Sequence, residues 1–388
     1  MERGTTLVTE ASAPIEAHND EAQSPPPVFD VAVIGSGPAG AQAAVSAAHQ
    51  TRSVLVIEAG AVSQRKGRAF WSKSVEFQDA PVFPGITGPR LATALSAWMS
   101  AQVGRMVTIG GKPRHVGIWR RGGMVLRVTR VEPDEGVHAP AGYLFAIEAS
   151  TRALKAGTEL TIERFLTRSL VVASGFEDIW PDIDVTEGAD RLYQTHRILF
   201  RYAGNRKGWH VCIRCDGHLH LDEHIAVVAS GDFAWSIARG AQDFTGHITI
   251  LTNGADPDFS DARLATLAAR NIEVITEPIA AHIGKGTDLL GLKLSSGREV
   301  FADGFFVDYG LKANSEYLAS NDGWNLKTDD EGLLVVDEDG AVLGADGNAV
   351  PGLFAAGDIV AGQRNLIATA FGLGQNAGLS AADLMREW

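Results

Sequence analysis

Two cysteines, three positions apart, are the residues of this chain with the clearest capacity for chemistry. Cys212 and Cys215 are its only cysteines, and residues 209–217 read Trp-His-Val-Cys-Ile-Arg-Cys-Asp-Gly. Two thiols at this spacing can exchange with a disulfide, because one thiolate attacks the partner and the second sulfur resolves the mixed disulfide. Arg214 and the nearby His210 or His218 could lower a thiol pKa electrostatically. The pattern predicts a redox-active dithiol.

A metal site is the main alternative for the same segment. Cys212, Cys215, His218 and His220 offer two thiolates and two imidazoles within nine residues, and zinc accepts such a ligand set. Zinc fingers usually separate their two ligand pairs by about a dozen residues, and ligands this crowded rarely complete a tetrahedron. We therefore favour the redox dithiol, with zinc and chemically inert thiols as the alternatives.

A second chemical signature begins at residue 29. Residues 29–34 form a short β-branched apolar run, typical of a buried parallel strand, and residues 35–40 read Gly-Ser-Gly-Pro-Ala-Gly. The alanine-rich residues 41–48 favour a helix, and a second strand over residues 53–57 ends at Glu58. This order of strand, G-x-G-x-x-G turn, helix, strand and acid predicts a dinucleotide site.

The residues of this turn have separate roles. Gly35 permits the turn, Gly37 lets the backbone approach a pyrophosphate, and Gly40 packs the helix on the strand. The pyrophosphate would lie at the helix N-terminus, where amide groups and the helix dipole favour an anion. Glu58 lies 23 residues after Gly35, close to the spacing of about 20 residues expected of the acid that binds a ribose.

Three later segments resemble the pyridine-nucleotide-disulfide type of flavoprotein. Residues 350–358 end in Gly357-Asp358, residues 368–377 resemble the helix that starts under the flavin, and residues 170–175 resemble the segment that returns the chain to the FAD domain. In that family the Asp binds the ribityl and phosphate region, so the resemblance implies FAD. The candidate cofactor-binding residues are Gly35, Gly37, Pro38, Ala39, Gly40, Glu58, Ala59, Gly357, Asp358 and Ala368.

The dithiol segment closely resembles the redox centre of bacterial-type thioredoxin reductases, in which C-x-x-C is followed directly by Asp-Gly. Residues 81–89 add a likeness to the proline- and glycine-containing segment beside the flavin of that family. The resemblance implies that Cys215 lies against the flavin, that Cys212 is the interchange thiol and that Asp216 shuttles protons. Related reductases are homodimers, so a homodimer is expected here.

The second nucleotide-binding unit departs from the thioredoxin reductase pattern. In its strand–turn–helix segment, residues 224–235, Ala229 replaces the first glycine, and Phe233 and Trp235 flank the turn. Residues 252–254 read Thr-Asn-Gly, without the arginines of an NADP site or the acid of an NAD site. The acids that follow are Asp256, Asp258 and Asp261. They would repel a phosphate, so we expect that this unit keeps its fold but does not bind NADPH in the ordinary way.

An enzyme of this type without a nicotinamide site needs another electron partner. Two related groups fit: the diflavin-linked or ferredoxin-linked disulfide oxidoreductases of photosynthetic and anaerobic bacteria, and the oxygen-dependent dithiol oxidases of small molecules. Residues 173–183 resemble a segment common among such NADPH-independent relatives. The Asp216 that follows the dithiol favours the first group, with a second FAD or a low-potential protein as donor and a protein or small-molecule disulfide as substrate. A flavin-bound redox sensor is a further alternative.

Composition limits the other classes. The formal net charge of −13 argues against a nucleic-acid partner, which requires a basic surface. Windows of about 18 apolar residues are absent, and the N-terminus lacks the basic and apolar regions of a secretory signal. We therefore expect a cytoplasmic protein that does not enter a membrane.

The order of these segments predicts the domain organisation. We expect an α/β fold with two Rossmann-like (three-layer ββα) nucleotide-binding domains, as in thioredoxin reductase. We expect residues 1–28, which are acidic and proline-containing, to form a disordered tail. The FAD domain comprises residues 29–199 and 307–388, and a redox domain resembling the NADPH domain is inserted over residues 200–306.

Overall fold

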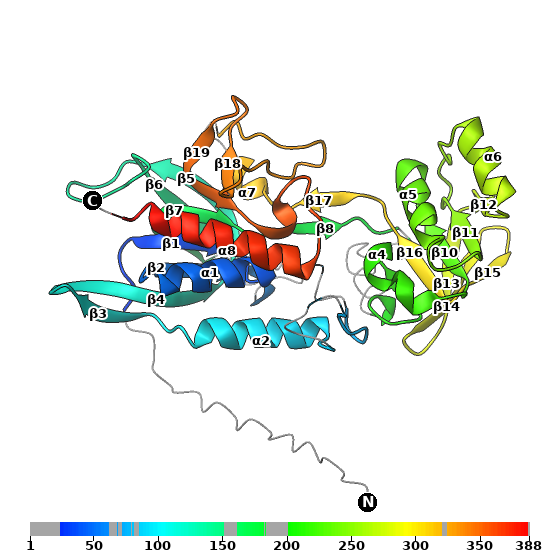
Figure 1. Ribbon diagram of the computed structural model, residues 1–388, viewed down its shortest axis with the longest axis horizontal. Helices are drawn as coiled ribbons and strands as arrows, with labels where there is room; N and C mark the ends of the chain where they lie inside the picture. The colour runs from blue at the N-terminus through cyan, green and yellow to red at the C-terminus, as the bar shows by residue number, and fades with distance from the viewer. Residues whose placement is uncertain are drawn as a thin grey trace, which may run out of the picture.

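The computed structural model describes residues 24–61, 68, 72–78, 80, 85–150, 161–181, 183, 201–319 and 324–386. Residues 1–23 of the expected tail, residues 81–84 and the expected domain boundary at 199/200 lie outside these ranges. Within the described residues the chain forms two bodies, each built on a parallel sheet and joined by two extended segments (Figure 1).

The larger body contains the predicted glycine turn. Its main sheet has the order β18-β19-β7-β1-β2-β4-β3, and β5 pairs with β6, which pairs with β7. The strands are β1 (Phe29–Ile34), β2 (Ser53–Glu58), β3 (Arg105–Ile109), β4 (Lys112–Gly122), β5 (Met124–Val131), β6 (Leu144–Ser150), β7 (Ile162–Val172), β18 (Ala341–Leu343) and β19 (Ala349–Ala355). Its helices are α1 (Pro38–His49), η1 (Ala59–Ala61), α2 (Gly88–Ser100), α7 (Glu316–Ala319), η4 (Gly357–Ile359) and α8 (Ile367–Asp383).

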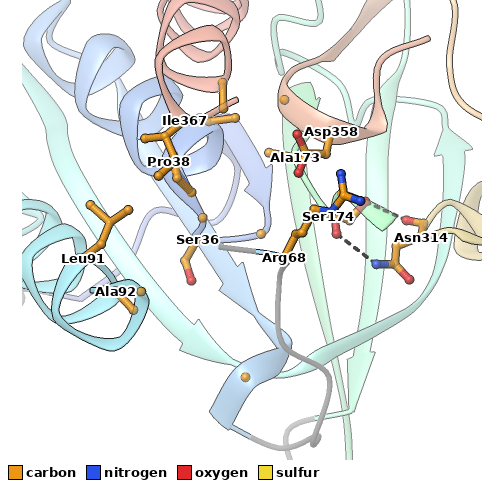
Figure 2. A pocket seen from close by; sticks show the side chains of 18 of the residues that line it. Ser36, Pro38, Arg68, Leu91, Ala92, Ala173, Ser174, Asn314, Asp358 and Ile367 are labelled. Atoms are coloured by element: carbon orange, nitrogen blue, oxygen red, sulfur yellow. Dashed lines mark hydrogen bonds between the residues drawn. The ribbon is translucent and has the colours of Figure 1, made fainter. Parts of the chain in front are cut away.

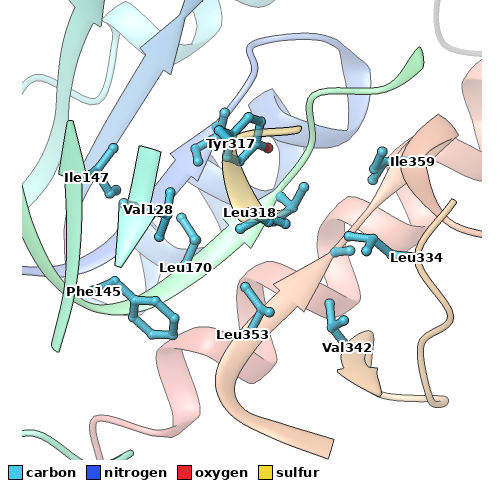
Figure 3. Packing of buried hydrophobic residues seen from close by; sticks show 14 of the residues in the cluster. Val128, Phe145, Ile147, Leu170, Tyr317, Leu318, Leu334, Val342, Leu353 and Ile359 are labelled. Carbon is cyan, nitrogen blue, oxygen red and sulfur yellow. The ribbon is translucent and has the colours of Figure 1, made fainter. Parts of the chain in front are cut away.

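The central strands of this sheet are parallel and buried on both faces. In β1, Val31 and Val33 belong to the cluster that also contains buried alanines of α1 and α8. Ala32 and Ile34 point to the opposite face and join a second cluster, because successive side chains of a strand alternate. Figure 3 shows this second cluster, in which Leu170 and Leu353 from neighbouring strands pack beside residues of β5, β6 and α7.

The smaller body carries the dithiol. Its five-stranded parallel sheet has the order β12-β11-β10-β16-β9, and β13, β14 and β15 form an antiparallel sheet. The strands are β9 (Trp209–His210), β10 (Ile225–Val228), β11 (Ile248–Leu251), β12 (Glu273–Ile275), β13 (Ile279–Lys285), β14 (Asp288–Leu294), β15 (Glu299–Phe301) and β16 (Gly304–Val307). The helices are α4 (Ile213–Asp216), η3 (Gly217–His220), α5 (Gly231–Ala241) and α6 (Asp261–Ala269).

Two antiparallel strands, β8 (Phe176–Asp178) and β17 (Leu311–Ala313), connect the bodies (Figure 1). The predicted α/β class with two Rossmann-type units is confirmed. The expected boundary at 306/307 falls inside β16, which continues to Val307 because that residue pairs with Val228 of β10. Among the described helices, none is long and apolar enough to cross a membrane.

Candidate active site

A cavity of about 800 Å³ extends from the glycine turn of the larger body to the dithiol of the smaller one. Figure 2 shows part of its wall, with Ser36 and Pro38 from the glycine turn and the start of α1, and Ala173 and Ser174 after β7. Most of the predicted site residues belong to this wall. They are Gly35, Gly37, Pro38, Ala39, Glu58, Ala59, Cys212, Cys215, Asp216, Gly357 and Asp358.

The glycine turn is shaped by close backbone packing. Gly35 has φ +106°, and a Cβ placed on it would lie 2.3 Å from the carbonyl oxygen of Ala173. A Cβ on Gly40 would lie 2.1 Å from the carbonyl oxygen of Gly35, so this glycine packs the turn and is not part of the cavity wall. A Cβ on Gly37 would have no neighbour within 4 Å. The turn therefore leaves open space in front of α1, where a pyrophosphate binds in this type of motif.

Glu58 lies at the end of β2 and is held by two side chains. One carboxylate oxygen accepts a hydrogen bond from Ser36 Oγ at 2.7 Å, and the other accepts one from Arg120 Nη2 at 2.8 Å. A carboxylate has about four lone-pair sites, so both oxygens keep capacity for ribose hydroxyls. Arg120 from β4 was missed in the sequence, because its pairing depends on the parallel register of β2 and β4.

Of the candidate residues near the C-terminus, Gly357 and Asp358 line the cavity, and Ala368 lies on the protein surface. Gly357 has φ +79°, and a Cβ on it would lie 2.7 Å from the Cβ of Ala39. Asp358 lines the cavity; burial raises the pKa of its carboxyl, the guanidinium of Arg68 opposes this rise and Asp178 adds to it. Ala368 is exposed and is not part of the wall, which is formed here by neighbours such as Ile367 and Ala370. The helical repeat of α8 turns Ala368 away from the cavity.

Cys212 and Cys215 form a disulfide, with their Cα atoms 5.3 Å apart. Cys212 precedes α4 in extended conformation, and its Sγ accepts a hydrogen bond from the backbone amide of Cys215 at 3.1 Å. Both cysteines are partly buried and line the cavity, whereas Arg214 between them is exposed. A negative charge on the Cys212 sulfur would be stabilised by the amide hydrogen bond.

Asp216 contacts a buried histidine that precedes the dithiol. His210 Nδ1 and Asp216 Oδ2 are 2.9 Å apart, and the His210 side chain is fully buried. His220 lies on the other side of His210, with their Nε2 atoms 3.3 Å apart. Of the two histidines that the sequence analysis considered for an effect on the thiols, His210 contacts Asp216, and His218 is exposed.

Arg68 is a wall residue that no sequence pattern indicated. Its Nη2 ion-pairs with Asp178 at 2.9 Å and donates to the carbonyl of Val211, next to the dithiol, at 2.8 Å. Figure 2 shows Arg68 beside Ser174 and Asn314. Burial raises the pKa of the Asp178 carboxyl, an effect that Arg68 opposes. The guanidinium therefore links the larger body to the segment that carries the cysteines.

In the smaller body, the turn at Gly231 that corresponds to the first glycine turn is hydrogen-bonded to another segment of the chain. Gly231, with φ +55°, donates its amide to the carbonyl of Pro257 at 2.9 Å. A Cβ on Gly231 would lie 3.7 Å from a carboxylate oxygen of Asp258, and the exposed Asp232 begins the same helix. Arg263, which the sequence analysis missed, is engaged by Asp232 at 2.6 Å. At the position where a pyrophosphate binds in this type of motif, the chain therefore has the carboxylates of Asp232 and Asp258, and the amide of Gly231 is already hydrogen-bonded.

In residues 252–254, where an NAD or NADP site would have its ribose or phosphate ligands, the polar side chains bond to the protein backbone. Asn253 Oδ1 accepts the amide of Ile279 at 2.7 Å, and Thr252 Oγ1 donates to the carbonyl of Ala255 at 2.6 Å. Phe233 is 42% exposed, whereas Trp235 is partly buried and packs beside Phe259. Across the described residues, no group of three or more His, Cys, Asp and Glu side chains is arranged to hold a metal ion.

These features agree with a comparison against protein families. The family model described as pyridine nucleotide-disulphide oxidoreductase matches residues 29–374, and the chain belongs to this family of FAD-binding flavoproteins. Among curated proteins, an alkyl hydroperoxide reductase component of Pseudomonas aeruginosa is 27% identical over 365 residues, 92% of this chain and 58% of that protein. A NADH dehydrogenase of Bacillus subtilis is 25% identical with the same coverage. The chain thus spans less than two thirds of these relatives.

Solved structures show the same fold. HlmI aligns with a TM-score of 0.68 at 21% identity, covering 92% of each chain. The thioredoxin reductase of Streptococcus pyogenes aligns with a TM-score of 0.65 at 19% identity, covering 92% of this chain and 98% of that one. The predicted likeness to thioredoxin reductases is therefore confirmed at the level of the fold and the family.

Proposed function

We propose that this chain is an FAD-dependent thiol–disulfide oxidoreductase that does not take its electrons from a nicotinamide nucleotide. The observation that carries the proposal is the shared cavity: the glycine turn around Gly37 and the Cys212–Cys215 disulfide line the same space of about 800 Å³. A dithiol and a dinucleotide cofactor that share a cavity can exchange electrons without a diffusing carrier. Once reduced, the Cys212–Cys215 dithiol would pass these electrons to a protein or small-molecule disulfide by thiol exchange, which re-forms the enzyme disulfide.

The residues of the larger body fit FAD. Open space in front of Gly37 suits a pyrophosphate, Glu58 has acceptor capacity for ribose hydroxyls, and the buried Asp358 lines the cavity from the C-terminal side. When bound, FAD would supply a carrier of two electrons. The turn residues would orient it, and the partly buried walls would limit the access of water to the dithiol.

The two cysteines have different surroundings, which supports different roles. Cys212 Sγ accepts a hydrogen bond from the backbone amide of Cys215. The Cys212 thiolate would therefore be the better stabilised nucleophile for exchange with a disulfide substrate. Cys215 would then be the sulfur that faces the flavin. Asp216 follows it directly, lines the same cavity and would exchange protons with the thiols.

The turn at Gly231 in the smaller body lies beside carboxylates and is hydrogen-bonded to Pro257, which supports an electron donor other than NADPH. Asp232 and Asp258 would repel a pyrophosphate, and the Gly231 amide that could bind it is already bonded to Pro257. We propose a second bound flavin or a low-potential protein as the donor. The exposed ring of Phe233 offers a face to a planar guest. We also propose a homodimer, as in the reductases that the chain resembles, which sedimentation would test.

Flavin content tests the first half of the proposal. The purified wild type should carry non-covalent FAD, whereas Gly37→Trp should be purified without it, because the indole fills the space of the pyrophosphate. Gly246→Trp is a matched control, since Gly246 is exposed, has no neighbour within 4 Å of an added Cβ and lies in the smaller body. A wild type that contains no flavin and binds none when FAD is added would refute the proposal.

Oxygen uptake with dithiothreitol, read beside the number of flavins per chain, separates the alternatives. More than one flavin per chain with slow oxygen uptake supports the diflavin route. One FAD per chain with rapid hydrogen peroxide formation identifies an oxygen-dependent dithiol oxidase instead. A protein that is reduced once and does not turn over a disulfide acts as a redox sensor.

A further inference from the structure

Five polar residues continue from the dithiol into the smaller body, and the function proposed above uses only the first. Asp216 contacts His210, His210 contacts His220, and His220 Nδ1 lies 2.9 Å from Glu223 Oε2. Glu223 Oε1 accepts a hydrogen bond from Arg206 at 2.6 Å. The two imidazoles are fully buried, so each hydrogen bond has to be satisfied within this group.

The packing of the smaller body leaves space for these rings. Phe306 of β16 stacks on His210, with ring centroids 4.9 Å apart, and meets His220 edge-on at 5.9 Å. A Cβ on Gly304 would lie 2.6 Å from Nε2 of His220. A glycine is therefore needed at this position of β16, since a larger residue would displace the His220 ring.

The carbonyl of Arg206 fixes the position of one hydrogen on His210. It lies 3.0 Å from Nε2 of His210, and a carbonyl can only accept, so that nitrogen carries a hydrogen. His220 Nε2, at 3.3 Å from the same nitrogen, must then be an acceptor. The hydrogen of His220 lies on Nδ1 and is donated to Glu223. Burial lowers the pKa of His220, and the neighbouring His210 adds to this effect, which agrees with a neutral ring.

This arrangement determines what lies between His210 and Asp216. With Nε2 protonated, Nδ1 of a neutral His210 has a lone pair, and it faces a carboxylate oxygen at 2.9 Å. Two acceptors at this distance repel each other unless one proton lies between them. The pair therefore holds one proton, as a carboxylic acid with a neutral imidazole or as a carboxylate with an imidazolium.

We propose that His210 and Asp216 share this proton and deliver it to the first thiolate released from the Cys212–Cys215 disulfide, while His220, Glu223 and the Arg206 carbonyl hold His210 in the required tautomer. This inference rests on the proposed dithiol function and adds His210 as the proton-sharing partner of Asp216. Asp216, His210 and both cysteines line the same cavity. The side chain of Asp216 is 23% exposed, which gives the pair access to solvent.

The step balances with a dithiol as reductant. One thiolate of the dithiol attacks the sulfur of Cys212, the Cys212–Cys215 bond breaks, and the released Cys215 thiolate takes the proton of the pair. The second sulfur of the reductant then displaces Cys212, which gives the oxidised reductant and the reduced enzyme. The pair regains a proton from solvent, supplied overall by the thiols of the reductant.

Opening of the disulfide by dithiothreitol tests the proposal on the full-length holoprotein. Free thiols are trapped with a maleimide at set times and counted by mass spectrometry, so the readout needs no flavin turnover. We expect His210→Asn and Asp216→Asn each to open about 10²-fold more slowly than the wild type, the range of general acid catalysis. The double variant should be no slower than the slower single variant, since the two residues act as one unit.

His247→Asn is the control, because His247 is exposed in the same body and lies outside this group. It should open at the wild-type rate. Wild-type opening in both single variants, or multiplied losses in the double variant, would overturn the proposal. If His210→Asn does not fold, His220→Gln serves instead, because it keeps His210 and Asp216 but removes the imidazole that holds His210 in one tautomer. Disulfide opening should again be slower than in the wild type. An unchanged rate would overturn the proposal.

A spectroscopic signal gives a second readout, independent of rate. In holoprotein labelled with ¹⁵N-histidine, a strongly hydrogen-bonded proton on a ring nitrogen should resonate at low field. It should disappear in Asp216→Asn and His210→Asn and remain in His247→Asn. Its persistence in the first two variants would overturn the proposal. The proposed function fails separately, through absence of FAD or of disulfide turnover in a wild type whose disulfide still opens normally.

Discussion

At the residue scale, the two sulfurs of the disulfide differ in the groups that surround them. The Cys212 sulfur accepts the amide of Cys215, and the carbonyl of Val211 before it is held by Arg68 from the larger body. Asp216 is fixed on its other side by His210. The dithiol is therefore oriented by contacts on both sides, and each cysteine can have a single role.

Replacing each cysteine by serine tests this assignment of roles. Cys212→Ser should show a long-wavelength charge-transfer absorbance, because in the proposed roles the remaining Cys215 thiolate would lie against the flavin. Cys215→Ser should lack that band. Anaerobic absorbance spectra of the two variants at the same pH are sufficient. The band in Cys215→Ser alone would reverse the assigned roles.

The sequence indicated the candidate site residues that belong to short motifs, but not the residues that hold them in position. The cysteines and the glycines of the turn belong to short motifs whose spacing carries the geometry, Asp358 was indicated by the family resemblance, and most of these residues line one cavity. Arg68 and the tautomer of His210 depend on contacts between distant segments, which no local pattern encodes. Ala368 illustrates a third case: the helix was correctly predicted, but the side of it that faces the cavity depends on how α8 packs.

At the element scale, the contact between α1 and α8 brings the two halves of the candidate cofactor site together. A Cβ on Gly374 would lie 2.2 Å from the carbonyl oxygen of Ala39, and one on Gly378 would lie 2.4 Å from that of Ala43. Glycines thus allow the helix backbones to approach closely. This contact places the start of α1, which follows the glycine turn, beside Gly357 before α8.

Substitution of the glycines of α8 tests this packing. Gly374→Ala should destabilise the protein by about 1–3 kcal/mol, because the added methyl group meets backbone that cannot move aside. Gly372→Ala, in the same helix, is the control: Gly372 is exposed, has no neighbour within 4 Å of an added Cβ, and its replacement should stabilise the helix by up to about 1 kcal/mol. Denaturant unfolding of both variants measures the difference. Equal effects would show that the helices are not tightly packed here.

The two strands that flank the first glycine turn and its helix were predicted because their patterns are local. The run over residues 29–34 and the one ending at Glu58 are β-branched and bounded by a glycine turn or an acid, and they form β1 and β2. The order of strands in the sheets is different, since it depends on pairing between distant segments. Strand order was not predicted from the sequence, because hydrophobic pattern alone does not determine it.

At the scale of the whole molecule, the two nucleotide-binding units have diverged in what their turns can accept. The turn at Gly37 is open, whereas the turn at Gly231 is bonded to Pro257 and faces Asp258. The sequence showed the loss of the first glycine at Ala229, but it could not show that the loop after β11 folds back on the turn. That contact supports the proposal of a donor other than a nicotinamide nucleotide.

Mixing with reduced nicotinamides tests this difference between the units. NADPH and NADH should reduce the FAD of the wild type slowly or not at all, because Asp258 lies beside the turn at Gly231 and Asp232 follows it directly. Anaerobic stopped-flow absorbance gives the rate. Rapid and complete bleaching of the flavin at low NADPH concentration would contradict the prediction and indicate an ordinary nicotinamide-dependent reductase.

The most direct test of electron exchange between FAD and the dithiol is an anaerobic reductive titration of the purified holoprotein with dithionite, followed by flavin absorbance. If FAD and the Cys212–Cys215 disulfide share electrons, the wild type should consume two electrons for each flavin and two more for the disulfide. The Cys212→Ser, Cys215→Ser double variant should consume only those of the flavin. Equal consumption by the two proteins, with the wild-type disulfide still intact after the flavin is bleached, would contradict this exchange.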